Sequence, residues 1–431
     1  MLLARLTHPP FVPACVRNIV TRAQRTPWMW FAACLVLPLL LSACALAAPT
    51  AEPVTIIFAH PNFDETYYRG LVEQYKKTNP HVTIELKPRR WDMLGGLSAD
   101  GADVVVTSQF ALEDLLAKNQ IVSLDPLIAQ DKTVDMADFY AGSVRLFVSN
   151  GKTWGLPAGL DPYVMYYNRD LFEQRRVALP VSGWTADEFL RTAAALRDPA
   201  ANIYGYAVVT DMIDPLLFIY QRGGKLFDDL QNPTRTTFDD PRTIEAVAWY
   251  AKLLTEYNVA PTSDEVRRFF NNRIQIGIYR NQVGMWMGPL SNRGGQLEPQ
   301  RWQIKWGMAA LPRGAEYATM ATAEGYFIMS QCKKLQECWR WVVFMSKQPG
   351  NGFVPPRKSV AASKAYEQQV GSELASIARA SVTNAVLIRP TDLEKFAAVV
   401  DLFGKALKSV VDGQATAQEA MQRAQQSSPL K

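Results

Sequence analysis

The chain has 431 residues, of which 46 are lysine or arginine and 41 are aspartate or glutamate, so its formal net charge is +5. Residues 1–43 hold four of the basic residues and none of the acidic ones, so the rest of the chain carries only +1. This near balance gives no electrostatic basis for nucleic-acid binding, and the chain is too long for one compact core. We therefore expect two lobes and no nucleic-acid partner.

The N-terminal segment has the three parts of a secretory signal. Scattered arginines precede an apolar run over residues 28–41, and Ser42, Ala43 and Cys44 follow it. A basic region, an apolar region and a small-residue exit predict export. The cysteine directly after Leu-x-Ala resembles a bacterial lipobox, which implies lipidation of Cys44 and a mature chain that begins there. The alternative is a plain transmembrane anchor, because residues 28–48 are about long enough to span a bilayer.

The exported part of the chain keeps two cysteines, Cys332 and Cys338, which are six residues apart. Outside the cytoplasm such a pair can form a disulfide, and two separate buried thiols are the alternative. Only two histidines, His60 and His81, remain after the signal, and neither is near the pair in sequence. We therefore expect no metal site and no cofactor.

The hydrophobic pattern of the first third of the exported chain alternates strands with helices. Strands are predicted over 54–59, 82–86 and 103–106, and helices over 64–78, 93–99 and 112–118. A strand-helix-strand order predicts parallel strands joined by right-handed crossovers. The fold class that follows is α/β.

Capping residues mark three later helices. Two of these helices begin with a capping box, a threonine followed three residues later by a glutamate, at Thr185 and Thr416. Asp240 supplies an N-cap before Pro241 in the first turn of another helix. Apolar residues over 396–410 recur at helical spacing and predict one more helix near the C-terminus.

The sequence has no motif of the catalytic classes that carry one. G-x-S-x-G, H-E-x-x-H, the P-loop and G-x-G-x-x-G are all absent, and two histidines leave few members for a nucleophilic triad. A carboxylate pair of the glycosidase type leaves no recognisable spacing among 41 acidic residues. We therefore expect a protein that is not an enzyme.

The chain has eleven tryptophans. An aromatic ring can cover the flat C–H face of a sugar, while polar side chains bind its hydroxyl rim. The candidate rings, each with core packing as the alternative, are Trp91, Trp154, Trp184, Trp286, Trp302 and Trp306. Trp249, Trp339 and Trp341 lie in helical patterns and are assigned to the core.

Ten segments spread over residues 54–425 carry a recognisable family pattern. In chain order they are VTIIFAHP (54–61), LVEQYKKTNPHVTIELKP (71–88), ADVVVTSQF (102–110), WGLPAGLDPYVMYYNRDLF (154–172), GWTADEFL (183–190), YQRGGKLFDD (220–229), FDDP (238–241), EGYFIMS (324–330), WRWVVFMSKQ (339–348) and PPRKS (355–359). Together they resemble the extracellular solute-binding proteins of sugar-binding ABC importers, the family 1 type that includes maltose- and glycerol-phosphate-binding proteins. The most specific signal is GLP…YYN-x-DLF together with NP-x-V-x-I-E. One departure is Asn281, where the family usually has glycine; asparagine can also adopt a left-handed turn.

The resemblance implies a two-lobe α/β fold of the type II periplasmic-binding-protein kind, with the ligand in a cleft between lobes joined by crossovers. The crossovers are expected near 157–161, 311–312 and 355–358. The implied parts are a signal peptide (1–43), a tether (44–53), an N-terminal lobe (54–158 and 313–354), a C-terminal lobe (159–312 and 355–425) and a tail (426–431).

Candidate ligand-binding residues follow from the resemblance and from the rule that open parallel sheets bind ligands at the carboxyl ends of their strands. Those after the first three strands are His60, Asn62, Trp91, Ser108 and Gln109. Those at the crossovers and in the second lobe are Asp161, Tyr163, Trp286, Glu324, Tyr326 and Arg357.

The expected function is capture of a mono- or oligosaccharide by a monomeric protein that a lipid on Cys44 tethers to the membrane, in the periplasm or at the cell surface. The partners are the membrane permease subunits of an ABC importer with their cytoplasmic ATPase. Three alternatives stay open. They are a charged solute such as glycerol phosphate, held by His60, Arg293 and Arg357; an exported glycan hydrolase; and a sugar-sensor subunit.

Overall fold

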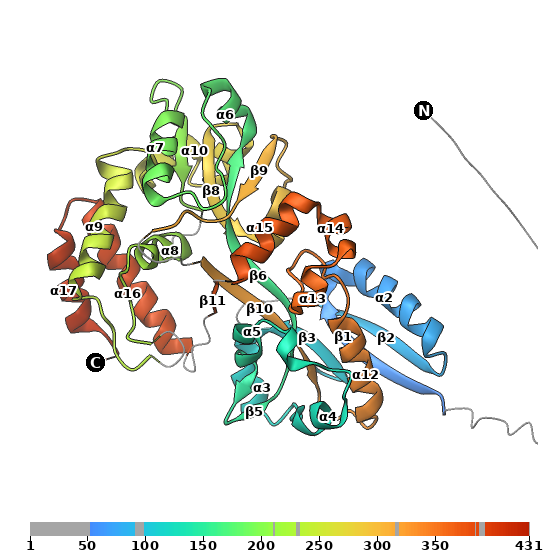
Figure 1. Ribbon diagram of the computed structural model, residues 1–431. Coiled ribbons are helices and arrows are strands. Elements are labelled where there is room, and N and C mark those ends of the chain that lie inside the picture. Colours follow the sequence, from blue (N-terminus) through green and yellow to red (C-terminus); the bar gives the residue numbers. More distant parts are fainter. Residues whose placement is uncertain are drawn as a thin grey trace, which may run out of the picture. The chain divides into compact units, whose positions relative to one another are not determined.

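The computed structural model describes residues 52–90, 99–209, 212–229, 233–314, 319–383, 385–387 and 393–430. Pro53–Lys431 form one compact unit in which helices surround a mixed sheet (Figure 1). Cys44, Trp91 and all but the last residue of the predicted helix over 93–99 lie outside the described residues. No helix in the described ranges is long and apolar enough to cross a membrane.

The sheet runs in the order β2-β1-β3-β10-β6-β8-β7, with β11 paired to β10 and β9 paired to β6. Its strands are β1 (Val54–Pro61), β2 (Val82–Arg89), β3 (Val104–Ser108), β6 (Leu156–Asn168), β7 (Tyr204–Ala207), β8 (Val283–Pro289), β9 (Trp306–Ala309), β10 (Thr319–Ile328) and β11 (Ala385–Leu387). A separate hairpin consists of β4 (Val148–Ser149) and β5 (Lys152–Thr153). β1 pairs with β2 and β3 in parallel, which confirms the predicted parallel pairing.

The helices flank this sheet. They are α2 (Glu65–Thr78), α3 (Leu112–Ala117), α4 (Asp125–Gln130), α5 (Ala141–Arg145), α6 (Arg169–Arg175), α7 (Ala186–Leu196), α8 (Ile213–Gln221), α9 (Pro241–Thr255), α10 (Ser263–Phe270), α11 (Gln275–Tyr279), α12 (Leu335–Ser346), α13 (Lys358–Ala361), α14 (Lys364–Val370), α15 (Ser372–Thr383), α16 (Leu393–Val411) and α17 (Ala417–Ser427). Short 3₁₀ turns are η1 (Asn62–Asp64), η2 (Gln109–Ala111), η3 (Met136–Asp138) and η4 (Leu290–Gly295). The predicted strands and helices of the first third are present wherever the structure describes that part of the chain.

Two long antiparallel strands, β6 and β10, connect the first-lobe strands β1, β2 and β3 with the second-lobe strands β7, β8 and β9 (Figure 1). The first half of β6 pairs with β10, and its second half pairs with β8 and β9. Val354 forms a bridge to Leu160 of β6, which brings a third segment beside the two strands. The lobe boundaries given above stay predictions.

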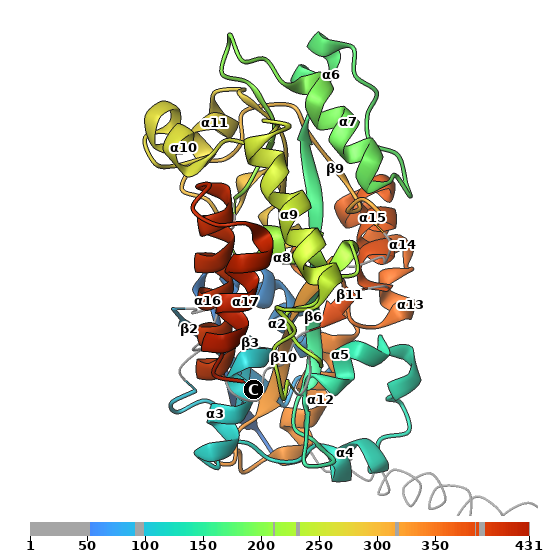
Figure 2. The ribbon, with the colours of Figure 1, turned by 90° about the vertical axis from the view of Figure 1, so that its left-hand side faces the viewer.

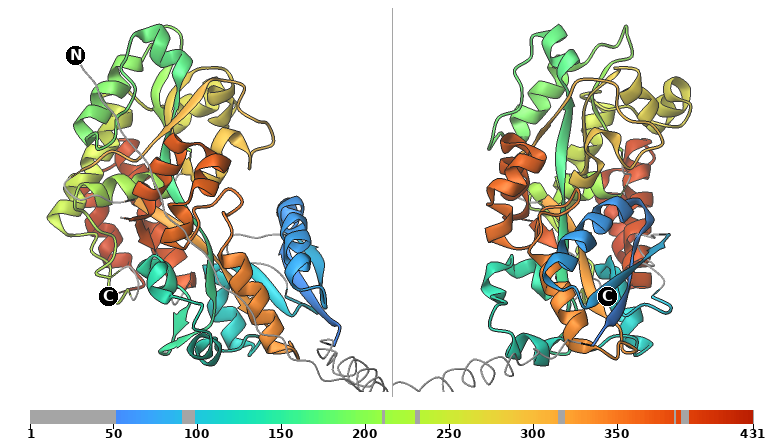
Figure 3. Two further views of the ribbon diagram at one scale, coloured as in Figure 1. Left: turned by 45° about the vertical axis from the view of Figure 1, so that its right-hand side comes forward. Right: turned by 90° about the vertical axis from the view of Figure 1, so that its right-hand side faces the viewer.

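Each set of strands has its own apolar core. On the first-lobe side, α2 packs against β2, and α12 packs against β1 and β10 (Figure 3). Trp339 and Trp341 of α12 are fully buried there, as predicted. On the other side α9, α16 and α17 pack against one another (Figure 2), and Trp249 lies half-buried against Phe218.

The local sequence signals behave as expected. Thr185 and Thr416 both form complete capping boxes, and the Asp240 side chain accepts a hydrogen bond from the first turn of α9. Asn281 has a φ of 61°, so the left-handed turn is made by asparagine, whose short polar side chain tolerates it. Its Oδ1 accepts a hydrogen bond from Nδ2 of Asn168 at the end of β6.

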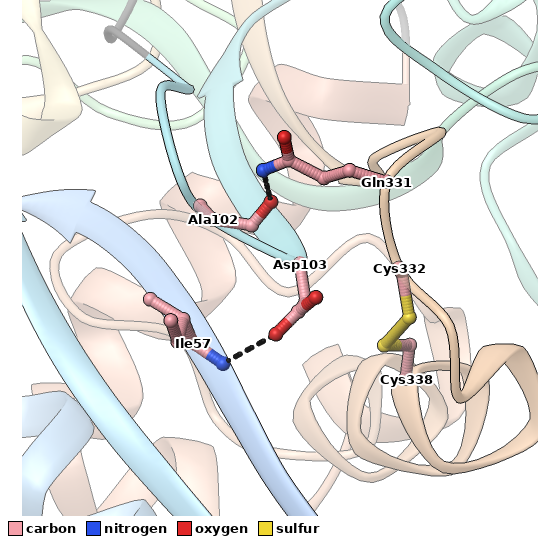
Figure 4. The surroundings of a disulfide bond; sticks show 6 residues. All are labelled: Ile57, Ala102, Asp103, Gln331, Cys332 and Cys338. Carbon is pink, nitrogen blue, oxygen red and sulfur yellow. Dashed lines mark hydrogen bonds between the residues drawn. A yellow bond between two sulfur atoms is a disulfide. The ribbon is translucent and has the colours of Figure 1, made fainter.

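A disulfide joins Cys332 to Cys338 (Figure 4). It connects the turn after β10 to the first turns of α12. Gln331, beside the first cysteine, donates a hydrogen bond to the Ala102 carbonyl. The neighbouring Asp103 Oδ2 accepts from the Ile57 amide of β1 at 2.9 Å. The bridge therefore closes one end of the first-lobe sheet, opposite to the strand ends that carry the candidate residues.

Candidate functional site

Three buried carboxyl groups meet beside the crossover strands. Asp64 ends η1 directly after β1, Asp161 lies on β6 and Glu324 lies on β10, and each is about 5% exposed. Asp161 is the register partner of Thr322, and side chains two residues apart on a strand share a face. Glu324 and Asp161 therefore face the same side. Burial, followed by the negative charges of Asp64 and Asp161, raises the Glu324 pKa.

Asp161 is tied to the second lobe through Ser291 of η4. The Ser291 amide donates to Asp161 Oδ1 at 2.9 Å, and its hydroxyl donates to Oδ2 at 2.6 Å. Burial raises the pKa of Asp161 to about 6, and the Ser291 bonds and the charge of Arg293 oppose that rise. The carboxyl of a crossover strand is therefore positioned by the segment that directly follows β8.

Asp64 is tied to the loop after α12. Asn351 of this loop donates a hydrogen bond to Asp64 Oδ1, yet burial still raises the Asp64 pKa to about 6. The hydroxyl of Tyr67 donates to the Pro349 carbonyl at 3.0 Å. From the second lobe, Arg293 Nη1 donates to the carbonyl of Gly352 at 2.8 Å. The loop is therefore bonded to first-lobe and second-lobe side chains alike.

Glu324 differs from the other two carboxyls because one of its oxygens has nothing to bind. Oε1 is buried and has no hydrogen-bond partner among the described residues. Burial, followed by the charges of Asp64 and Asp161, raises the Glu324 pKa to about 8. A buried acceptor without a partner costs on the order of 1–3 kcal/mol, so a donor brought to this oxygen would remove that cost.

An aromatic ring lies beside this carboxyl. Glu324 pairs with Gly159 of β6, and a Cβ on Gly159 would come within 2.8 Å of the Phe353 Cβ. Phe353 therefore covers the glycine on the face that carries Asp161 and Glu324. Its side chain is half-buried. Only glycine leaves room for this approach.

The first-lobe wall contains several of the predicted residues. His60 is the next-to-last residue of β1 and is fully buried. Its Nδ1 is 2.9 Å from the Pro61 carbonyl. Burial lowers the His60 pKa, so the imidazole is neutral at pH 7, and its Nε2 has no partner among the described residues. Its ring centroid is 5.1 Å from that of Tyr68, which in turn hydrogen-bonds Tyr326.

The residues at the end of β3 also lie next to Glu324 of β10. Ser108 is the register partner of Glu324, and its hydroxyl caps η2 by accepting from the Phe110 amide at 3.3 Å. Gln109 Oε1 accepts from the amide of Ala323, the residue before Glu324. Asn62, on η1, is exposed. The structure thus brings six predicted residues to the carboxyl cluster or its walls, namely His60, Ser108, Gln109, Asp161, Glu324 and Tyr326.

Three other predicted residues lie elsewhere. Trp286 is 1% exposed, and its ring centroid is 4.9 Å from that of Trp302 in an aromatic cluster of the second lobe. Arg357 is 4% exposed and bonds Ser346 Oγ at 3.1 Å. Tyr163 is two residues beyond Asp161 and is buried in the second-lobe core.

Sequence reasoning did not select Asp64, Ser291, Asn351 or Phe353. Asp64 is two residues after Asn62, but it was assigned to the start of the following helix. Ser291 had a usable signal, because it closely follows a second-lobe strand just as Ser108 closes a first-lobe strand. Asn351 and Phe353 had none, because both lie in a loop between helices that only long-range contacts bring here.

The site is acidic. Among the described residues, no lysine, arginine or histidine forms an ion pair with Asp64, Asp161 or Glu324, and Arg293 acts only through its charge on Asp161. The described ranges hold no group of three or more side chains suited to bind a metal.

Comparison with known proteins agrees with this geometry. The family model of the bacterial extracellular solute-binding proteins matches residues 60–351. The chain belongs to this family. A putative binding protein of Brucella abortus is 24% identical over 317 residues, which are 70% of this chain and 75% of that protein.

Solved structures share the fold at low sequence identity. An ABC substrate-binding protein of Listeria monocytogenes, in complex with cycloalternan, has a TM-score of 0.69 and 18% identity, covering 87% of this chain and 98% of its own. The sugar-binding protein MalE of Xanthomonas citri has a TM-score of 0.68 and 20% identity, covering 87% and 96%. UgpB of Mycobacterium tuberculosis, in complex with glycerophosphocholine, has a TM-score of 0.66 and 18% identity, covering 86% and 96%. The two-lobe α/β fold expected from the sequence is confirmed.

Proposed function

We propose that this protein captures a sugar or polyol outside the cytoplasm and delivers it to the permease subunits of an ABC importer, as a monomer and without covalent chemistry. Membership of the solute-binding family supports capture of a small molecule. The observation that carries the ligand class is the buried Oε1 of Glu324, which has no partner within the described ranges and lies on the strand face that carries Asp161. Such acceptors bind hydroxyl or N–H donors, and Phe353 beside them suits the C–H face of a sugar.

A charged solute such as glycerol phosphate is the less favoured ligand. Its phosphate would need cations, yet the predicted ones are engaged elsewhere or uncharged. Arg357 is paired with Asp138 at 3.6 Å, Arg293 is bonded to Gly352, and His60 is kept neutral by burial. Three carboxyls would repel the phosphate.

The test is a thermal-shift and calorimetry screen of the chain from residue 45 onward against sugars, polyols and phosphorylated polyols. A ligand at a hundred times its dissociation constant adds about 2.7 kcal/mol to the free energy of unfolding, which is a shift of a few degrees. A hit among neutral or amino sugars and polyols supports the proposal. A hit among the phosphates alone, or none at all, contradicts it.

Glycan hydrolysis is a second candidate, because neighbouring carboxyls with separated pKa values, about 8 for Glu324 and about 6 for Asp161, are also what an acid and a base require. Release of product from chromogenic glycosides, abolished by Asp161→Asn, would support this activity. Tight sugar binding without turnover would exclude it.

The membrane tether is a separate proposal that depends on Cys44. We propose that its thiol carries lipid and holds the exported chain at the membrane. Full-length protein should fractionate with membranes, and Cys44→Ser should release it. Retention of the Cys44→Ser variant at the membrane would favour the transmembrane-anchor alternative.

A further inference from the structure

The buried carboxyls carry more negative charge than their surroundings balance. When ionised, Asp64, Asp161 and Glu324 bring three negative charges into a place where every carboxyl is about 5% exposed. Among the residues that the structure describes, Arg293 is the cation whose charge acts on Asp161, and it is itself bonded to the Gly352 carbonyl. Moving an ionised carboxyl out of water without a paired cation is strongly unfavourable.

Two of the carboxyls are satisfied by the protein and one is not. Asp161 accepts two hydrogen bonds from Ser291, and Asp64 accepts one from Asn351. Glu324 Oε1 accepts none from any described residue, although it is buried.

A neutral hydroxyl would satisfy the hydrogen bond of this oxygen but would leave the charges unbalanced. A protonated amine supplies donors and a positive charge together, so it can satisfy the Glu324 oxygen and offset the negative charge beside it. The half-buried ring of Phe353 next to Glu324 adds a surface suited to a cation or to a sugar face.

We propose that the solute carries a protonated amine, as an amino sugar or an amino polyol does, and that this amine binds at Glu324 Oε1, on the face of the paired strands β6 and β10 that also carries Asp161. This inference rests on the proposed function and narrows its ligand class. The hydroxyls of the same solute bind the remaining polar groups of the walls, such as His60 Nε2.

The pH dependence of binding separates an amine from a hydroxyl. The other titratable and charged groups that interact with these carboxyls are Tyr67, Tyr68, Tyr163, Tyr166, Tyr326 and Arg293. Burial raises the pKa values of the tyrosines, so they stay uncharged below pH 8, and an arginine stays charged. His60 lies on the same wall, and burial lowers its pKa. The carboxyls lose their protons between pH 5 and 8, since burial raises their pKa values to about 6, 6 and 8. Affinity for an amine that stays protonated should therefore rise with pH, whereas affinity for a neutral polyol should not.

The experiment is calorimetric titration with matched pairs of probes. They are glucosamine against N-acetylglucosamine and glucose, the deacetylated against the acetylated β-1,4-linked disaccharide of glucosamine, and glucamine against sorbitol. We expect the amine of at least one pair to bind tenfold or more tightly than its neutral partner at pH 7.5. Glucamine, whose alkyl amine stays protonated over this range, should lose at least tenfold of its affinity between pH 7.5 and pH 5.5.

Variants locate the effect. Glu324→Gln keeps the shape and removes the charge, so it should abolish the preference for amines over their neutral partners. Glu85→Gln, at an exposed position on β2, changes the net charge equally and should keep the preference. If Glu324→Gln does not fold, Asp64→Asn and the pH series on the unaltered protein carry the same test.

The calorimetric results distinguish a failure of the amine inference from a failure of the proposed function. Neutral partners that bind as tightly as the amines overturn the amine inference and leave sugar or polyol capture standing. A preference for amines that survives Glu324→Gln overturns the assignment to this carboxyl. Binding to no member of any pair contradicts both this inference and the proposed function.

Discussion

Two regions of the molecule bury charge, and they differ in the sign of the charge beside it. Arg357 is enclosed, and Asp138 pairs with it at 3.6 Å, Ser346 accepts its Nε–H, and the Phe139 ring lies 4.5 Å from the guanidinium carbon, although its Nη2 has no hydrogen-bond partner among the described residues. Glu324 is equally enclosed, but its Oε1 has no described partner and the charges that raise its pKa are those of two other acids, Asp64 and Asp161. A buried charge beside an opposite charge is held by the protein itself. One beside like charges costs stability, which a ligand can restore.

The largest expected effect is a gain in stability, although a substitution at a buried position usually lowers the free energy of unfolding. Glu324→Gln should raise the free energy of unfolding at pH 7 by roughly 3 kcal/mol, because it removes the penalty of a carboxyl whose pKa rises from 4.5 to about 8 on folding. Below pH 4.5 the carboxyl is protonated in both states, so the variant gains nothing there. The gain should grow as the pH rises and level off above about 8. Urea unfolding of both proteins from pH 4.5 to 8.5 measures this difference, and a constant difference would contradict the raised pKa.

A loss of stability is expected when Arg357, which is paired with Asp138, is replaced. Arg357→Met keeps the aliphatic volume but leaves Asp138 without its cation and Ser346 without its donor. We expect a loss of about 2 kcal/mol in the free energy of unfolding and unchanged ligand affinity. Denaturant unfolding and titration with the identified ligand check both parts. An affinity loss of tenfold or more at full folding would return Arg357 to the ligand-binding residues, as the sequence had suggested.

One added methyl group at Gly159 should displace Phe353, which packs closely against this glycine. Gly159→Ala would place a Cβ within 2.8 Å of the Phe353 Cβ, so the ring must shift away from Glu324. The fold should survive at a cost of about 1–2 kcal/mol, because overpacking displaces one half-buried ring. Ligand affinity should fall about tenfold, which calorimetry will detect. Unchanged affinity would show that the ring is not part of the site.

The smallest effect is expected at the hydrogen bonds that position Asp161. Ser291→Ala removes the 2.6 Å hydroxyl bond and leaves the amide bond, so the free energy of unfolding should fall by about 1 kcal/mol. Losing a donor to the ionised form raises the pKa of Asp161 further. Ligand affinity should therefore fall a few-fold at pH 6 and less at pH 8. An equal loss at both pH values would mean that Ser291 touches the ligand itself.

Much of the fold followed from local signals. The parallel first-lobe strands, the capping boxes at Thr185 and Thr416 and the left-handed Asn281 are decided by residues near one another in the chain, so the sequence contains them. The strand-end rule gathered His60, Ser108 and Gln109 with Glu324 for the same reason.

The partners of those residues could not be predicted. Asn351 meets Asp64 across 287 positions of sequence, and Ser291 meets Asp161 across 130. Trp286 illustrates the limit from the other side. Its neighbours Met285 and Met287 face one apolar core and Trp286 faces another, so both faces of β8 are covered. A sequence pattern shows that an aromatic residue lies on a strand, but it does not show which other side chains cover its ring.

The most direct test of the account compares the ligand-induced thermal shift of the unaltered protein with that of Glu324→Gln, using the best probe from the panel at a fixed multiple of its dissociation constant for the unaltered protein. We expect Glu324→Gln to have a higher melting temperature than the unaltered protein without ligand. Its melting temperature should rise much less when the ligand is added. Equal shifts in both proteins would contradict the claim that the unpartnered Glu324 oxygen binds the solute.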